Sequence, residues 1–104
     1  MMTRNYKISL KKISPKSILM SCDQEMEIGE RLLVELSFER NKKVRFLGEV
    51  SYTFKNQLTS QEAYDIRLDY EKISENDIAV LEELTASGDA EKYVTQFFVA
   101  PINV

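Results

Sequence analysis

The side chains best suited to chemistry in this chain are basic groups gathered near its N-terminus. Between Met1 and Cys22 there are five basic residues and no acidic one, while the remainder carries nine basic and 17 acidic residues. Ammonium and guanidinium groups hold phosphates and carboxylates, so this stretch predicts a local anion site on a chain of net charge −3. Alternatively, the lysines only protect strand edges from aggregation. The candidate ligand-binding residues here are Arg4, Lys7, Lys12 and Lys16.

The residues that common catalytic sites require are missing. The chain has no histidine and a single cysteine, Cys22, which excludes Ser/His/Asp and Cys/His nucleophilic sites and the usual zinc sites. Its three glycines are isolated at positions 29, 48 and 88, so no glycine-rich phosphate loop is present. We therefore predict a protein that is not an enzyme and that carries no metal and no cofactor.

Composition and charge limit the kinds of partner that the protein can bind and the cellular compartment in which we expect it. The chain is 43% hydrophobic and 30% charged, a balance typical of one globular domain. No apolar run approaches the roughly 20 residues that span a bilayer, so we expect no membrane insertion. A lone cysteine and a start without an export signal favour a cytoplasmic protein. No basic groove follows a strand, and the aromatic residues alternate in phase with core positions, so no nucleic acid polymer is expected; these aromatics are Phe38, Phe46, Tyr52, Phe54, Tyr64 and Tyr70.

Alternation of apolar and polar residues dominates the chain and predicts half-buried strands. Five such segments lie at about residues 6–10, 17–22, 32–39, 44–54 and 64–70. In the longest, Gly48 is expected to mark a bulge or a bend. Five strands joined by short turns indicate a sandwich or a barrel. The predicted core positions are Val34, Leu36, Phe46, Val50, Ile66 and Leu68.

One segment changes to a helical period. Ser74 suits the N-cap of a helix, with Asp77 in the first turn and Gly88 as the C-cap. An apolar stripe runs along one face between them. We therefore predict an α-helix over about residues 75–86.

The C-terminal tail, residues 89–104, fits two structures. Asp89 could cap a second short helix, whereas the β-branched and aromatic residues that follow suit a strand, and we favour the helix. The tail is too apolar to be free in water, so it should pack on its own barrel or on a second copy. The polar break at residues 87–89 favours the second copy, as a homodimer. The candidate partner contacts are Tyr93, Phe97 and Phe98.

The order of these elements resembles the PilZ family, bacterial domains that typically bind cyclic di-GMP. The resemblance implies a mostly-β fold, a small antiparallel PilZ-like β-barrel with a C-terminal α-helix. It implies one domain over residues 1–104, with the barrel at about 5–72, the helix at about 75–86 and the tail at 89–104. The segments that carry it are Tyr6–Met20, Met26–Leu36, Val44–Val50, Tyr64–Leu68 and Ile73–Leu81.

The family's ligand signature, Asp/Asn-x-Ser-x-x-Gly after an Arg-x-x-x-Arg loop, is largely lost. Aligned on Ser14, its first position is Lys12 and its last is Ser17, and Arg4 is the single upstream arginine. The resemblance thus adds Ser14 to the candidate site, but it implies weak or absent cyclic di-GMP binding, because arginine forks hold phosphate and guanine better than lysine does. We predict a non-enzymatic PilZ-like regulatory or protein-interaction module. The alternatives are a cyclic di-GMP receptor with an atypical basic site, or a structural assembly subunit.

Overall fold

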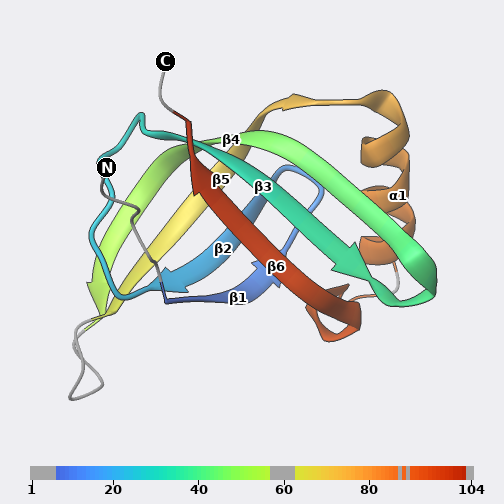
Figure 1. Cartoon of the computed structure of the whole chain (residues 1–104), viewed down its shortest axis with the longest axis horizontal. Coiled ribbons are helices and arrows are strands. Elements are labelled where there is room, and N and C mark those ends of the chain that lie inside the picture. The colour runs from blue at the N-terminus through green and yellow to red at the C-terminus, as the bar shows by residue number, and fades with distance from the viewer. Residues whose placement is uncertain (1–6, 57–62, 87, 89, 103–104) are drawn as a thin grey trace.

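The computed structural model describes residues 7–56, 63–86, 88 and 90–102. These residues form six strands, one α-helix and two short 3₁₀ turns (Figure 1). Each of the five predicted strands is present, and a 3₁₀ turn separates the third from the fourth. In chain order the elements are β1 (Ile8–Ile13), β2 (Ser17–Cys22), β3 (Arg31–Phe38), η1 (Glu39–Asn41), β4 (Lys42–Asn56), β5 (Ala63–Ile73), α1 (Glu75–Ala86), η2 (Ala90–Tyr93) and β6 (Val94–Pro101).

The strands form a single antiparallel sheet in the order β1-β2-β5-β4-β3-β6. The sheet curls into a nearly closed barrel, with α1 at one end and β6 crossing one side (Figure 1). β1 and β6 are the two ends of the strand order, and the ladders of the described residues do not join them. The predicted mostly-β barrel with a helix after the main strands is confirmed.

The barrel core consists of the side chains that the alternation placed inside. All six predicted core positions are buried, with exposed fractions of 2% or less. The ring of Phe46 packs edge-on against Tyr70, with ring centres 4.5 Å apart. A register shift between β4 and β5 falls at Gly48, as predicted, and a side chain there would sit 3.2 Å from the Phe46 ring. The glycine therefore leaves room for the largest core residue.

A β-bulge in β4 overturns the prediction that Tyr52 and Phe54 lie in the core. Relative to β5, β4 carries one extra residue, Ser51, and an extra residue inverts the alternation beyond it. Tyr52 and Phe54 are consequently 47% and 55% exposed and stack on the outer face, with ring centres 6.4 Å apart. Thr53 pairs with buried Ile66 instead.

The helix begins and ends where the capping residues predicted. The Ser74 hydroxyl accepts the Asp77 backbone N–H at 3.1 Å, which satisfies one of the free donors of the first turn. At the other end, Gly88 has a φ of +74°, a conformation that glycine adopts without strain, and its N–H donates to the Thr85 carbonyl. Leu81 is the buried residue of α1, and the helix packs on β4.

The prediction of a helix in the C-terminal tail is wrong. After the short turn η2, residues Val94–Pro101 form β6, which pairs antiparallel with β3. A strand here satisfies the backbone groups along β3, which would otherwise be an open edge. It also separates two adjacent aromatic rings, since Phe97 packs against the core while Phe98 is 58% exposed.

Candidate functional site

The β1–β2 hairpin brings part of the predicted anion site together. Lys12 and Ser14 line a cavity of about 250 Å³ together with Ser17, Leu19 and Arg67. Lys7 and Lys16 do not line this cavity. Arg4 lies outside the described residues. The structure thus unites two of the five predicted residues and supplies an arginine from β5.

Ser14 is already engaged within the hairpin turn. Its hydroxyl accepts the Ser17 backbone N–H at 3.1 Å, and its carbonyl accepts the Tyr70 hydroxyl at 2.7 Å. Burial raises the pKa of Tyr70, so this phenol remains a hydrogen-bond donor at neutral pH. Ser14 therefore has a structural role in closing the turn.

Arg67 is the site residue that the sequence analysis missed. It stands on the outer face of β5, where its Nε donates to the Ser51 hydroxyl at 2.9 Å and approaches Asp69 at 3.4 Å. Lys12 has no hydrogen-bond or ion-pair partner among the residues that the structure describes. In this cavity the Nε of Arg67 is therefore engaged, whereas the Lys12 ammonium has no partner among the described residues. The outward position of Arg67 was visible in the alternation, but its nearness to Lys12 depends on the pairing of β5 with β2.

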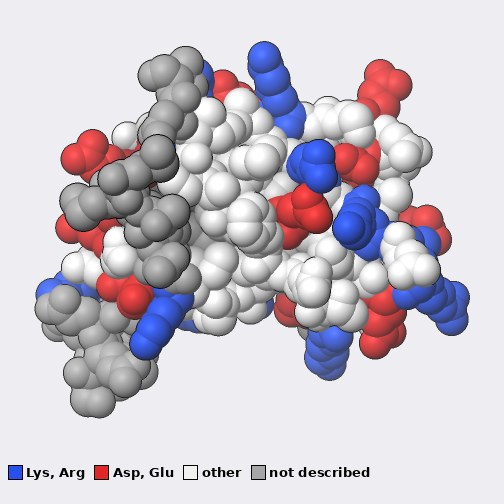
Figure 2. All heavy atoms as spheres, viewed as in Figure 1, with Lys and Arg blue, Asp and Glu red and all other residues white. Residues whose placement is uncertain are grey.

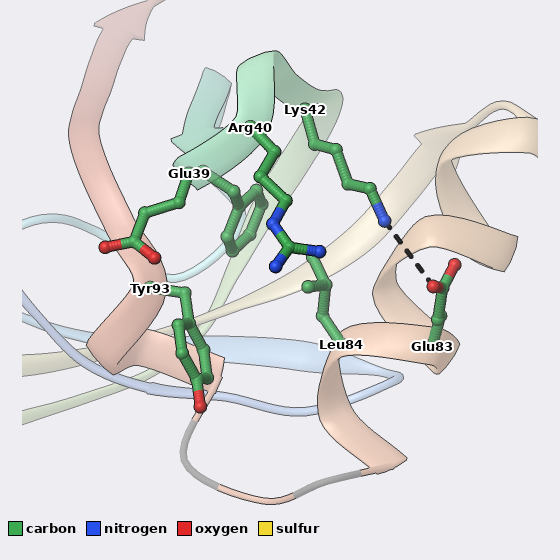
Figure 3. Close-up of a pocket in the computed structure, with 7 residues that line it drawn as sticks. Glu39, Arg40, Lys42, Glu83, Leu84 and Tyr93 are labelled. Atoms are coloured by element: carbon green, nitrogen blue, oxygen red, sulfur yellow. Dashed lines mark hydrogen bonds and ion pairs between the residues drawn. The ribbon is translucent and has the colours of Figure 1, made fainter.

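A second cavity, of about 320 Å³, lies between η1, α1 and η2 (Figure 3). In Figure 3 the Arg40 side chain extends toward its middle, Tyr93 stands on one side, and Lys42 pairs with Glu83 at 3.4 Å. Two cations and two carboxylates line the space, so it has no net preference for charge. The backbone of Arg40 and Asn41 is left-handed, with φ of 66° and 59°, a conformation that costs a residue with a side chain energy.

The two edge strands of the described sheet, β1 and β6, differ sharply in composition. β1 carries adjacent lysines at a register shift, and one of them, Lys11, pairs with Asp65 at 2.9 Å. Lysines and bulges are the common means of preventing a strand edge from pairing with another chain. β6 has neither feature along most of its length, because its eight residues contain no charge and its single irregularity lies at its start, near Phe38.

Two of the three predicted partner contacts are available at the surface of this edge. Phe98 is 58% exposed on β6, and Tyr93, directly before the strand, is 45% exposed. Phe97 is half-buried and packs against the core. Figure 2, drawn in the orientation of Figure 1, shows an uncharged area across the middle of this face, with charged side chains on both sides of it.

The hydrogen-bond pattern shows which backbone groups of β6 bond to β3 and which point away from it. Ile102 N–H donates to Arg31 at 3.3 Å, and the ladder register continues from this pair. In an antiparallel ladder, alternate residues direct both their N–H and C=O to the same neighbour. Phe98 and Ala100 therefore face β3, while Phe97 and Val99 direct their N–H and C=O groups to the free side. Pro101, which has no N–H, also falls on the free side, where edge prolines are tolerated.

No protein family, curated protein or solved structure matches this chain. The described residues contain no helix long and apolar enough to cross a membrane. They also contain no group of three or more His, Cys, Asp or Glu side chains placed to hold a metal ion.

Proposed function

We propose that this chain is a non-enzymatic, PilZ-like regulatory module that binds other proteins by accepting a strand on the free side of β6. The observation that carries the proposal is the edge itself: eight residues without charge, and backbone groups at Phe97 and Val99 that point away from β3 and pair with no other strand that the structure describes. Strand addition uses such groups for affinity and neighbouring side chains for specificity.

The side chains around β6 supply the specificity. Phe98 stands on the outer face, where a side chain of an added strand would lie beside it. The cavity that contains Tyr93 and Arg40 opens where β6 begins, so the end of an added strand could place one side chain in it. Aromatic and arginine residues are the ones that most often anchor protein interfaces.

A second candidate function, cyclic di-GMP binding, is favoured by the meeting of Lys12 and Arg67 in one cavity. Two properties weaken it. The cavity, at about 250 Å³, is smaller than the usual 300–1,000 Å³ of small-molecule sites. The Nε of the arginine is also engaged by Ser51 and Asp69. We therefore place strand addition first.

The test is capture from an extract of the source cells with three baits: the unaltered chain, Phe98→Lys and Phe54→Lys. Phe54 is a matched control because it is as exposed as Phe98 but lies on β4. We expect a partner held by the unaltered chain and by Phe54→Lys and lost with Phe98→Lys. In the purified complex, the amides of Phe97 and Val99 should become protected from hydrogen exchange. A partner retained equally by Phe98→Lys would contradict the proposal.

A further inference from the structure

We infer that β6 also accepts the β6 strand of a second copy of this chain, so that two barrels join through an antiparallel pair of edges. This inference rests on the proposed function, because it uses the same free side of β6. It goes further in naming the partner and the register. The pairing is twofold symmetric, with Phe98 opposite Phe98 of the second copy.

The backbone pattern suits this register. When Phe98 lies on the axis, Phe97 stands opposite Val99 of the second copy, and Val99 opposite its Phe97. These are the residues whose N–H and C=O groups face the free side, so each pair exchanges hydrogen bonds. Phe98 itself forms the closely spaced, non-hydrogen-bonded pair, where opposed side chains approach most closely.

The exposed aromatic rings select this register over its neighbours. A shift of the axis by one residue in either direction would place Phe98 opposite Gln96 or Ala100, and both phenylalanine rings would remain largely in water. Aromatic pairs directly across two strands are among the stabilising cross-strand contacts. With Phe98 on the axis, two side chains that are each 58% exposed cover one another.

Charge favours a second copy at this edge and opposes it at the other. β6 meeting β6 brings no charges together, because the strand has none. A β1–β1 pair centred on its lysines would bring the lysines of the two copies together, and like charges across strands are destabilising. A symmetric contact uses both β6 edges at once, so the assembly closes as a dimer and does not extend into a fibre.

The experiment is sedimentation of the full chain from about 1 to about 200 μM, the range in which modest affinities are measured. We expect the mass to rise from 12.1 kDa to twice that value across the series. Phe98→Lys should weaken the dimer at least about tenfold. Phe54→Lys, at 55% exposure, should leave it unchanged. Gln96→Lys, also exposed on β6, is a second edge variant that should weaken it too, and circular dichroism verifies that each variant is folded.

Two results would overturn the inference. One is an unaltered chain that remains monomeric at the highest concentration. The other is a dimer that survives Phe98→Lys and is lost with Phe54→Lys, which would assign the contact to the outer face of β4. Neither result decides the proposed function, because the capture experiment tests binding of a different protein. A chain that is monomeric but still binds that protein through β6 would contradict the dimer and support the proposed function.

Discussion

The two ends of the sheet show how one barrel can protect one strand edge and leave the other open. β1 has two lysines, a bulge and the Lys11–Asp65 ion pair. β6 has no charged residue and carries the exposed ring of Phe98. Because natural edges are normally protected, an unprotected one is the more informative of the two. The proposed function rests on this missing protection of β6 and on no catalytic or ligand motif.

The turns beside the two edges also differ, in their hydrogen bonds and in their backbone conformation. The turn between β1 and β2 is closed by Ser14 and Tyr70 through several hydrogen bonds. The turn between β3 and β4, which lies beside the cavity containing Tyr93, holds Arg40 and Asn41 in left-handed conformations. Backbone strain of this kind gathers at functional sites. Hydrogen bonds thus close the turn near β1, whereas the turn near β6 contains two left-handed residues.

The largest expected effect concerns the core that supports both edges. Phe46→Ala should lower the free energy of unfolding by about 3–5 kcal/mol, the usual loss for a buried phenylalanine. The matched substitution Phe54→Ala, on the exposed side of the same strand, should change it by less than about 0.5 kcal/mol. Urea denaturation of both variants measures the difference. Equal losses would show that the bulge at Ser51 does not invert the strand.

The next effect tests the closed turn near β1. Tyr70→Phe removes the hydroxyl that donates to Ser14 and should cost about 0.5–1.5 kcal/mol at neutral pH. Burial raises the pKa of Tyr70, so its stabilising contribution is complete below the unfolded tyrosine pKa of about 10 and is lost as the pH rises above it. Denaturation curves from about pH 7 to about pH 11 should converge for the two proteins. Parallel curves would rule out this role for Tyr70.

A smaller effect of opposite sign tests the strained turn near β6. Arg40→Gly should raise the stability by up to about 1 kcal/mol, since glycine accepts the left-handed backbone that costs other residues about 1–2 kcal/mol. Glu39→Gly is the control within the same turn. It has no positive φ to relieve and should destabilise slightly. A loss of stability in Arg40→Gly would mean that its side chain contributes more than its backbone costs.

The smallest expected effect is the response to cyclic di-GMP near β1. We expect no binding tighter than about 10 μM, near −7 kcal/mol, because the cavity is small and has a single arginine, whose Nε is already bonded to Ser51. Calorimetric titration measures it. A saturable nanomolar signal that Lys12→Glu abolishes would instead make the protected edge the functional one.

Local patterns predicted most of the fold. Val34, Leu36 and the other core positions followed from alternation, which depends on neighbours two residues away. The bounds of α1 followed from Ser74 and Gly88, whose effects reach only one turn. Strands β1 to β5 and helix α1 were therefore predictable from the sequence. Strand β6 was not, because its single apolar run fits both a helical and a strand pattern.

Features that depend on pairing between distant strands could not be predicted. The extra residue Ser51 exists only relative to β5, so nothing in β4 alone places Tyr52 outside. Arg67 reaches Lys12 through the register of β5 on β2. The open edge at β6 requires the strand order, which a single sequence does not contain.

Residue-resolved hydrogen exchange along β6 tests the central claim most directly, through comparison of the unaltered chain with Phe98→Lys at about 500 μM. Phe98 and Ala100 should be protected in the unaltered chain, since their backbone groups pair with β3, and Ala100 should stay protected in the variant. Phe97 and Val99 should be protected in the unaltered chain and exchange freely in the variant. Equal exchange of Phe97 and Val99 in both proteins would contradict the pairing of β6 with the β6 strand of a second copy.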